Sequence, residues 1–70
     1  MNPIRVGVVG AGALGYHHVR LLREMPEFRL SGFVEARPER SAQVSAELEV
    51  PAYSDLDTLL DDVDAVTIVV

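Results

Sequence analysis

Three glycines near the amino terminus are the residues whose spacing most directly indicates chemistry. Gly10, Gly12 and Gly15 form the pattern G-x-G-x-x-G, directly after the apolar run from Ile4 to Val9. Between a strand and a helix, the first glycine permits a sharp turn and the second lets a pyrophosphate approach the backbone. The third lets the helix pack tightly against the strand. The unpaired N–H groups and the dipole at the helix start favour phosphate, so we predict a phosphate-binding turn.

An acidic side chain follows the second apolar segment at the distance expected of a ribose-binding residue. Glu35 lies 20 residues after Gly15, which is close to the spacing of the acid that accepts hydrogen bonds from ribose hydroxyls in dinucleotide-binding folds. A solvated acid at a strand end is the alternative interpretation. Within the turn, Ala11, Ala13 and Leu14 offer further backbone N–H groups to the same ligand, and together these residues predict a dinucleotide site.

Arg37 and two histidines have more than one possible role. Arg37 could stack on adenine, pair with a ribose 2′-phosphate, or lie in solvent. His17 and His18 are adjacent, so they do not share a helix face and form a poor chelating pair, and the sequence has no cysteine to accompany them. We expect the histidines to pack or to support the turn. We therefore predict no metal site, no Ser/His/Asp arrangement and no catalytic side chain in this sequence.

Strands and helices alternate in the sequence pattern. Strands are expected over residues 4–9, 28–35, 50–53 and 65–70, and helices over residues 13–25, from Pro38 onwards, and behind Ser54-Asp55-Leu56-Asp57. The last of these segments resembles a capping box that begins at Ser54. Residues 1–3 are expected to be disordered. Pro51 removes a ladder donor, which favours an edge position for the third strand.

The apolar positions predict which residues face the sheet. In the first helix these are Leu14, Leu21, Leu22 and Met25, and in the second, more weakly, Ser41, Val44, Ala46 and Leu48. Phe28, Leu30 and Val34 are expected on one face of the second strand, and the fourth strand is expected to be buried on both faces. The predicted class is α/β, a partial Rossmann doubly wound parallel sheet of four strands in the order 3-2-1-4.

Composition excludes several classes of partner. The chain has 70 residues and a net charge of −5, and its six basic residues are all arginines. After Arg40 every charged residue is acidic, which argues against a nucleic-acid partner, because phosphate neutralisation requires a basic surface. No signal peptide and no apolar run of membrane-spanning length is apparent. We expect a protein of the cytoplasm without membrane contact, and one small domain over residues 1–70.

Several runs together resemble the Gfo/Idh/MocA oxidoreductases. They are the stretch from Arg5 to Leu22, the Val34-Glu35-Ala36-Arg37-Pro38-Glu39-Arg40 segment, the stretch from Tyr53 to Leu60, and Asp64-Ala65-Val66-Thr67-Ile68. The resemblance covers essentially the whole chain. It implies an NAD(P)-dependent oxidoreductase that acts on a sugar, cyclitol or nucleotide-sugar, with residues 1–70 as an incomplete N-terminal NAD(P)-binding Rossmann domain. It also implies NAD as cofactor, with NADP possible, and a homo-oligomeric full-length protein.

The same resemblance implies that the chain lacks the parts that carry catalysis. The family's catalytic lysine lies in a Glu-Lys-Pro motif after the next strand, and this sequence contains no lysine. The C-terminal domain that shapes the substrate pocket is also absent, so we expect the isolated chain to be inactive. Two alternatives stay open: an FAD-binding Rossmann fragment, although paired glycines do not follow Glu35, and a non-catalytic NAD-sensing module.

Overall fold

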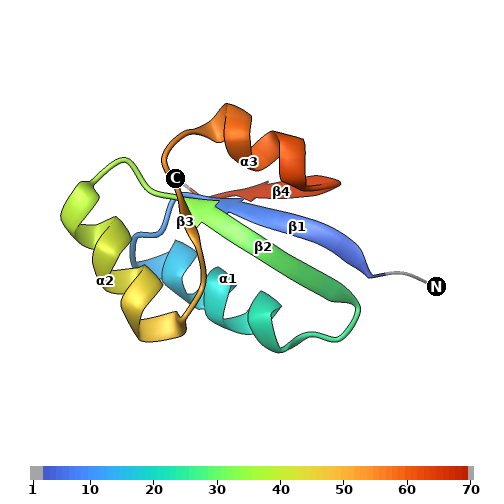
Figure 1. The fold of residues 1–70 in the computed structure, drawn as a ribbon. Coiled ribbons are helices and arrows are strands. Elements are labelled where there is room, and N and C mark those ends of the chain that lie inside the picture. The colour runs from blue at the N-terminus through green and yellow to red at the C-terminus, as the bar shows by residue number, and fades with distance from the viewer. Residues whose placement is uncertain (1–2, 70) are drawn as a thin grey trace.

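The chain forms a parallel four-stranded sheet with the order β3-β2-β1-β4. The computed structural model describes residues 3–69. The elements are β1 (Ile4–Val9), α1 (Ala13–Glu24), β2 (Phe28–Val34), α2 (Pro38–Leu48), β3 (Ala52–Tyr53), α3 (Leu56–Asp62) and β4 (Ala65–Ile68). Helices α1 and α2 lie on one side of the sheet and α3 on the other (Figure 1). The predicted α/β class and strand order are confirmed. The predictions for residues 1–2 and Val70 lie outside the described part.

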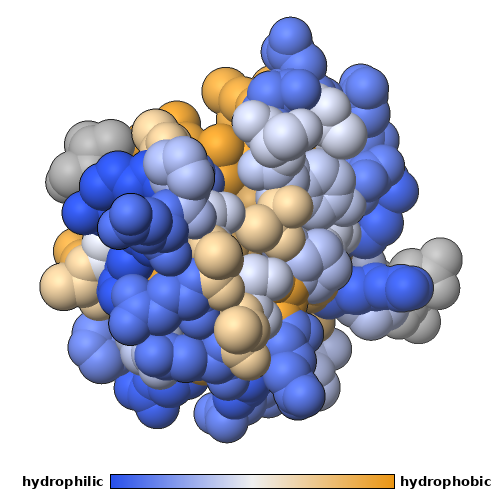
Figure 2. Space-filling model, turned by 60° about the vertical axis from the view of Figure 1, so that its left-hand side comes forward, coloured by the Kyte–Doolittle hydropathy of each residue, from blue (hydrophilic) through white to orange (hydrophobic). Residues whose placement is uncertain are grey.

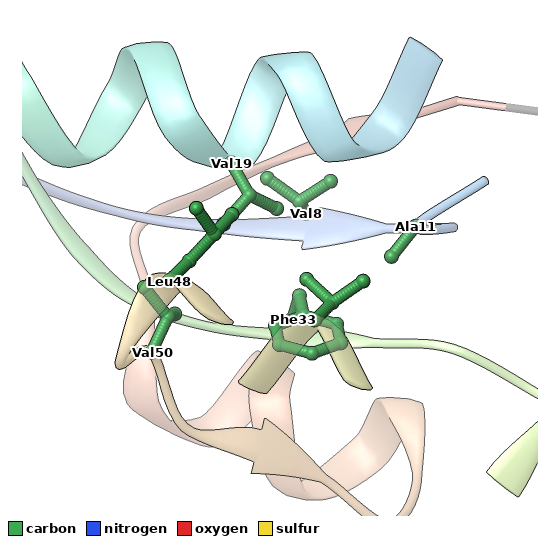
Figure 3. Packing of buried hydrophobic residues seen from close by; sticks show 7 residues of the cluster. Val8, Ala11, Val19, Phe33, Leu48 and Val50 are labelled. Carbon is green, nitrogen blue, oxygen red and sulfur yellow. The ribbon is translucent and has the colours of Figure 1, made fainter. Parts of the chain in front are cut away.

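The main core lies between the sheet and the two helices on its first side. Val8 of β1 and Phe33 of β2 are neighbours in the strand register, and both are fully buried. Val19 of α1 covers them, and Leu48 and Val50 extend the cluster at the end of α2 (Figure 3). Burial of these aliphatic and aromatic side chains supplies most of the driving force for folding. It also fixes α1, and therefore the turn before it, against the sheet.

The face of β2 differs from the prediction because this strand contains an extra residue. Val6 pairs with Leu30 and Gly7 pairs with Gly32, so Ser31 is bulged out of the register. A bulge shifts the side-chain alternation by one residue. As a result Leu30 packs against the cluster that contains Phe33, whereas the prediction grouped Leu30 with Val34. A regular period of two, assumed from the sequence, could not reveal this.

The apolar face of α1 was predicted correctly at Leu22 but wrongly at Leu14, Leu21 and Met25. Its buried residues are Gly15 and Val19, with Tyr16 and Leu22 partly buried against the core. Leu14, Leu21 and Met25, predicted to face the sheet, are exposed by 61%, 50% and 37%. The small Gly15 lies at the centre of the face that contacts the sheet. Because the prediction used only large apolar residues, it placed this face about a quarter of a helical turn from its observed position. In α2, Val44 and Leu48 are buried as predicted, whereas Ala46 is exposed.

The second half of the chain brings two further corrections. The N-cap of α3 is Asp55, not Ser54: its Oδ1 accepts hydrogen bonds from the Thr58 N–H and hydroxyl, both at 2.8 Å. These bonds hold the pKa of Asp55 below its usual value. The strand β4 is not buried on both faces, because Ile68 is 68% exposed.

The strands at the two edges of the sheet are short. β3 begins at Ala52 rather than Val50 and pairs only with β2, as the proline before it suggested. β4 pairs with β1. Hydrophilic residues predominate on the face shown in Figure 2, with exposed hydrophobic residues in separate patches. Among residues 3–69, no helix has the length and apolar character needed to cross a membrane.

Candidate functional site

The turn after β1 needs two of its three glycines for its own conformation. Gly10 has a φ of 95°, a value that favours glycine, and a Cβ there would collide with the carbonyl oxygen of Val69. A Cβ on Gly15 would collide with the carbonyl oxygen of Gly10. The predicted sharp turn at Gly10 is thus confirmed. The close packing at Gly15 is confirmed too, although α1 packs there against the turn as well as the sheet.

Gly12 differs from the other two, because nothing in the described chain requires a glycine there. Its φ of −68° is available to any residue. A Cβ would meet only the flexible Arg37 side chain, with Nη2 at 3.4 Å, which is close to ordinary van der Waals contact. The missing side chain therefore leaves a space in front of the turn that only the mobile end of the Arg37 side chain approaches. This cradle fits a ligand that must come close to the backbone, such as a pyrophosphate.

Several backbone N–H groups at the start of α1 have no acceptor among residues 3–69. Gly12 is the N-cap of α1, no side chain caps this helix end, and the Gly12 carbonyl accepts from Tyr16 N–H at 2.8 Å. The N–H groups of Gly12, Ala13 and Leu14 donate to no residue between positions 3 and 69. With the positive end of the helix dipole, they form an arrangement that suits an anion.

Glu35 lies beside the turn, one residue beyond the end of β2, with its side chain only 6% exposed. Its Oε1 accepts from Ala11 N–H at 3.0 Å, and its Oε2 accepts from Arg37 N–H at 2.8 Å. The Arg37 side chain, then the Arg37 and Ala11 N–H groups, lower the pKa of Glu35 to about 2. The structure therefore brings the predicted acid against the glycine turn as an ionised carboxylate.

Arg37 is held over the opening of the turn. Its Nε donates to Glu35 Oε2 at 3.0 Å and its Nη2 to Oε1 at 3.3 Å, while the side chain stays 65% exposed. Hydrogen bonding to Glu35 raises the pKa of Arg37 above its usual value. Of the three roles considered from the sequence, exposure to solvent agrees with the structure, although the side chain is also paired with Glu35. A stacking or phosphate-binding role stays a prediction.

Arg40 also contacts the turn, and the sequence analysis did not identify it. Its Nε donates to the carbonyl oxygen of Ala11 at 2.8 Å, and its guanidinium carbon lies 5.5 Å from the centroid of the Tyr16 ring. Its Nη1 donates to Gln43 Oε1 at 3.1 Å. The available signal was weak: an arginine in the first turn of the helix that follows the acid.

The two histidines lie on different sides of α1. His17 is exposed and contacts Tyr16 edge to face, with ring centroids 5.7 Å apart. His18 is half-buried and lines a shallow hollow with Leu21, Leu22, Met25 and Thr67. Over the described range 3–69, no three histidine, cysteine or acidic side chains gather where they could hold a metal ion. The predicted packing role thus fits His18, and His17 contributes to the surface beside the turn.

A second hollow lies next to the turn on the side of α2. It is lined by Ala36, Arg37, Pro38, Glu39, Arg40 and Gln43. The hollow has both apolar and polar walls, and one of its lining residues, Arg37, pairs with the Glu35 carboxylate. Such a surface suits a flat heterocycle joined to a sugar whose hydroxyls reach Glu35. Arg37 therefore links three features near the carboxyl ends of β1 and β2, because it lines the hollow, pairs with Glu35 and lies beside Gly12.

Known proteins share this arrangement of sequence and fold. The model of an oxidoreductase family with an NAD-binding Rossmann fold, Gfo/Idh/MocA, matches residues 4–70. The UDP-N-acetylglucosamine 3-dehydrogenase of Acidithiobacillus ferrooxidans is 41% identical over 69 residues, which are 99% of this chain and 21% of that enzyme. A solved structure of that enzyme, GnnA, superposes over 100% of this chain and 22% of its own, with a TM-score of 0.89 and 40% identity.

A second solved structure contains a bound dinucleotide. KijD10, a 3-ketoreductase from Actinomadura kijaniata in complex with NADP and TDP-benzene, is 29% identical with a TM-score of 0.76. The match covers 93% of this chain and 21% of KijD10. The chain therefore spans about a fifth of the length of these relatives. These similarities favour the oxidoreductase prediction over a flavin-binding fragment.

Proposed function

The chain belongs to the Gfo/Idh/MocA oxidoreductase family with the NAD-binding Rossmann fold, and from this premise we propose how its residues serve that family's activity. Residues 1–70 form the N-terminal, incomplete dinucleotide-binding domain of an oxidoreductase that acts on a nucleotide-sugar, sugar or cyclitol. A nucleotide-sugar is favoured because the similar UDP-N-acetylglucosamine 3-dehydrogenase is named for such a substrate. The bound nicotinamide would supply the hydride acceptor or donor.

The observation that carries this proposal is the open position at Gly12. The chain itself explains Gly10 and Gly15 by backbone collisions, whereas Gly12 has an ordinary φ and space for a side chain. A ligand that needs that space accounts for the glycine. The three unpaired N–H groups of Gly12, Ala13 and Leu14 face the same opening, and they would hold the pyrophosphate.

Glu35 would hold the ribose of the adenosine half. An ionised carboxylate offers about four acceptor positions, and the N–H groups of Ala11 and Arg37 with two donors of the Arg37 side chain fill them. A ribose hydroxyl would therefore replace a donor of the Arg37 side chain. With a pKa of about 2, Glu35 is ionised and ready to accept hydrogen bonds at neutral pH. Arg37 would turn part of its exposed guanidinium onto the adenine in the hollow lined by residues 36–40.

The same contacts favour NAD over NADP. The 2′-phosphate of NADP would place its negative charge against the Glu35 carboxylate. It would also replace the 2′-hydroxyl that would donate a hydrogen bond to Glu35 in NAD. Arg37 could offset this repulsion only by leaving Glu35, to which it donates at 3.0 and 3.3 Å. We therefore assign NAD as the preferred cofactor, with NADP the weaker ligand.

The remaining parts of the proposal concern the whole protein. A lysine in a Glu-Lys-Pro motif would carry the proton transfer that accompanies hydride transfer. Because this sequence has no lysine, the complete reaction would need residues outside it. We also propose a cytoplasmic location and a homo-oligomeric assembly for the full protein.

The second candidate function is an NAD-sensing module without turnover. An assay of the full protein for sugar oxidation distinguishes it from an oxidoreductase.

Calorimetric titration of the chain with NAD, NADP and ADP-ribose tests the proposed site. The Gly12→Val variant fills the open position and should lose at least ~100-fold in affinity for all three ligands, because the isopropyl group occupies the space of the pyrophosphate. The control is Ala65→Val, an exposed position at the start of β4, which should bind like the wild type. Unchanged NAD affinity in folded Gly12→Val would overturn the phosphate-loop assignment. Tighter binding of NADP than NAD would overturn the cofactor preference.

A further inference from the structure

One residue of the glycine turn is held by side chains from two other elements. The Ala11 N–H donates to Glu35 Oε1 at 3.0 Å, and the Ala11 carbonyl accepts from Arg40 Nε at 2.8 Å. Ala11 itself is fully buried, with an exposed fraction of 0%. The two peptide groups that flank Ala11 are therefore fixed independently, one by the acid after β2 and the other by an arginine in the first turn of α2.

The contact with Arg40 determines the direction of the next N–H group. A trans peptide is planar, so its C=O and N–H point in opposite directions. The described residues contain no cis peptide bond. When Arg40 draws the Ala11 carbonyl toward α2, the N–H of Gly12 points away from α2. That N–H is one of the three at the opening of the turn that have no partner among residues 3–69.

We propose that Arg40 is a positioning residue for dinucleotide binding, which acts by fixing the Ala11–Gly12 peptide. This inference rests on the proposed function, because it assigns the Gly12 N–H to the pyrophosphate. An N–H that already points at the phosphate costs no ordering when the ligand binds, so the benefit appears as affinity. Arg40 does this through the Ala11 carbonyl and not by contact with the pyrophosphate.

The surroundings of Arg40 favour this indirect role over a direct phosphate contact. Its Nε is committed to the Ala11 carbonyl and its Nη1 to Gln43 Oε1 at 3.1 Å. The guanidinium also lies over the Tyr16 ring at 5.5 Å, a distance at which a cation and an aromatic ring attract each other. Arg37, by contrast, keeps 65% of its side chain exposed at the opening.

The chain contains a matched control for this interaction. Arg23 Nη1 in α1 donates to the carbonyl oxygen of Leu48 at 2.7 Å, which also ties one helix end to another element. This bond lies at the C-terminal ends of α1 and α2, away from the glycine turn (Figure 1). Loss of either arginine removes one arginine–carbonyl hydrogen bond between elements. Only the loss at position 40 should change the turn.

Three variants test the inference: Arg40→Met, Arg40→Gln and Arg23→Met. Methionine keeps most of the side-chain length without a donor. Glutamine places a neutral N–H donor at the position along the side chain that Nε occupies, so it can restore the hydrogen bond but not the charge. The chain and its variants are titrated with ADP-ribose and with adenosine, and the amide proton of Gly12 is followed by NMR.

We expect Arg40→Met to bind ADP-ribose about fivefold to tenfold more weakly, the cost of one lost hydrogen bond. Adenosine, which lacks the pyrophosphate, should lose affinity by a smaller factor, although Arg40 also lines the hollow at the start of α2. Arg40→Gln should recover most of the affinity, and Arg23→Met should bind like the wild type. The Gly12 amide resonance should shift in Arg40→Met but not in Arg23→Met. If Arg40 only stabilised the fold, as Arg23 does, the two variants would not differ in this way.

Two outcomes overturn the inference while leaving the proposed function intact. One is wild-type affinity for ADP-ribose in a folded Arg40→Met variant. The other is an Arg40→Gln variant as weak as Arg40→Met, which would indicate that the positive charge acts directly on the phosphate. If the wild-type chain bound neither ADP-ribose nor NAD, the proposed function would fail first, and the inference with it.

Discussion

Two arginine–carboxylate pairs at opposite ends of the sheet have the same chemistry and different surroundings. At the carboxyl end, Arg37 and Glu35 meet at 3.0 Å, and at the amino end Arg5 and Asp64 also meet at 3.0 Å. In both pairs the carboxylate accepts a backbone N–H as well: Arg37 N–H at 2.8 Å and Arg5 N–H at 3.0 Å. The pairs differ in burial, since the Glu35 side chain is 6% exposed and that of Asp64 51%.

The difference shows what each pair contributes. Arg5 and Asp64 join two neighbouring strands, β1 and β4, and both side chains are half-exposed to solvent, where such pairs contribute little to stability. Glu35 also accepts a hydrogen bond from the N–H of the buried Ala11. This bond links the end of β2 to the glycine turn that precedes α1. An arrangement that buries an ionised acid beside open backbone N–H groups is typical of a binding site. The comparison therefore supports the proposal that the pair at the carboxyl end serves ligand binding and the pair at the amino end does not.

The largest expected contrast between the two ends is in ligand affinity. Glu35→Ala should weaken NAD binding at least ~10-fold, because the ribose hydroxyls lose their acceptor and the turn loses its tie at Ala11. Asp64→Ala should leave NAD affinity unchanged. Calorimetry on both variants provides the measurement, and an equal loss in the two would remove the functional distinction between the ends.

The next contrast concerns the choice of cofactor. Glu35→Gln removes the negative charge that opposes a 2′-phosphate and frees Arg37, so the ratio of NADP affinity to NAD affinity should rise about tenfold. The corresponding change at the amino end, Asp64→Asn, should not alter this ratio. Competitive titration with both cofactors measures it. A ratio that stays constant in Glu35→Gln would show that another residue discriminates the two ligands.

A smaller contrast is expected in stability. Glu35→Ala leaves the buried Ala11 N–H without an acceptor, which costs about 1–3 kcal/mol of the free energy of unfolding. Asp64→Ala exposes its partner Arg5 to water, which supplies new hydrogen bonds, so the unfolding midpoint should hardly move. Urea unfolding followed by circular dichroism provides both values. A larger loss in Asp64→Ala would reverse the comparison.

The smallest contrast is in the response to acid. The pKa of Glu35 is lowered from 4.5 to about 2, so the unfolded chain binds the proton first as the pH falls. The stability that Glu35 contributes is therefore complete above about pH 4.5 and is lost progressively as the pH falls toward 2. Hydrogen bonds from Arg5 lower the pKa of Asp64 in the same direction. Glu35→Gln should flatten the acid branch of a stability–pH curve more than Asp64→Asn does, and equal flattening would contradict the account.

The sequence predicted the fold well because its signals are local and strong. The apolar run of β1 followed by glycines, Pro38 at the start of α2 and the acid after β2 all lie where the patterns place them. The glycine turn and Glu35 were predicted together for the same reason, since their spacing follows from the length of one helix and one strand. Their role as cofactor-binding residues stays a prediction until ligand binding is measured.

What the sequence missed depends on contacts between elements. The bulge at Ser31 changes the register between two strands, and the small Gly15 at the centre of the α1 contact face leaves Leu14 exposed. The role of Arg40 depends on how α2 packs against the turn. Arg40 and its partner Ala11 are 29 residues apart in the sequence. No local pattern of residue types encodes these three features.

The most direct test of the account is a map of backbone amide shifts in the isotope-labelled chain during titration with NAD. The account predicts the largest shifts at Gly12, Ala13 and Leu14, smaller ones near Glu35 and Arg37, and none at Arg5 or Asp64. It also predicts that ADP-ribose gives the same shifts at the same concentrations, because the residues here hold only the adenosine and pyrophosphate. Shifts centred on Arg5 and Asp64, or an unperturbed glycine turn at saturating NAD, would contradict the central claim.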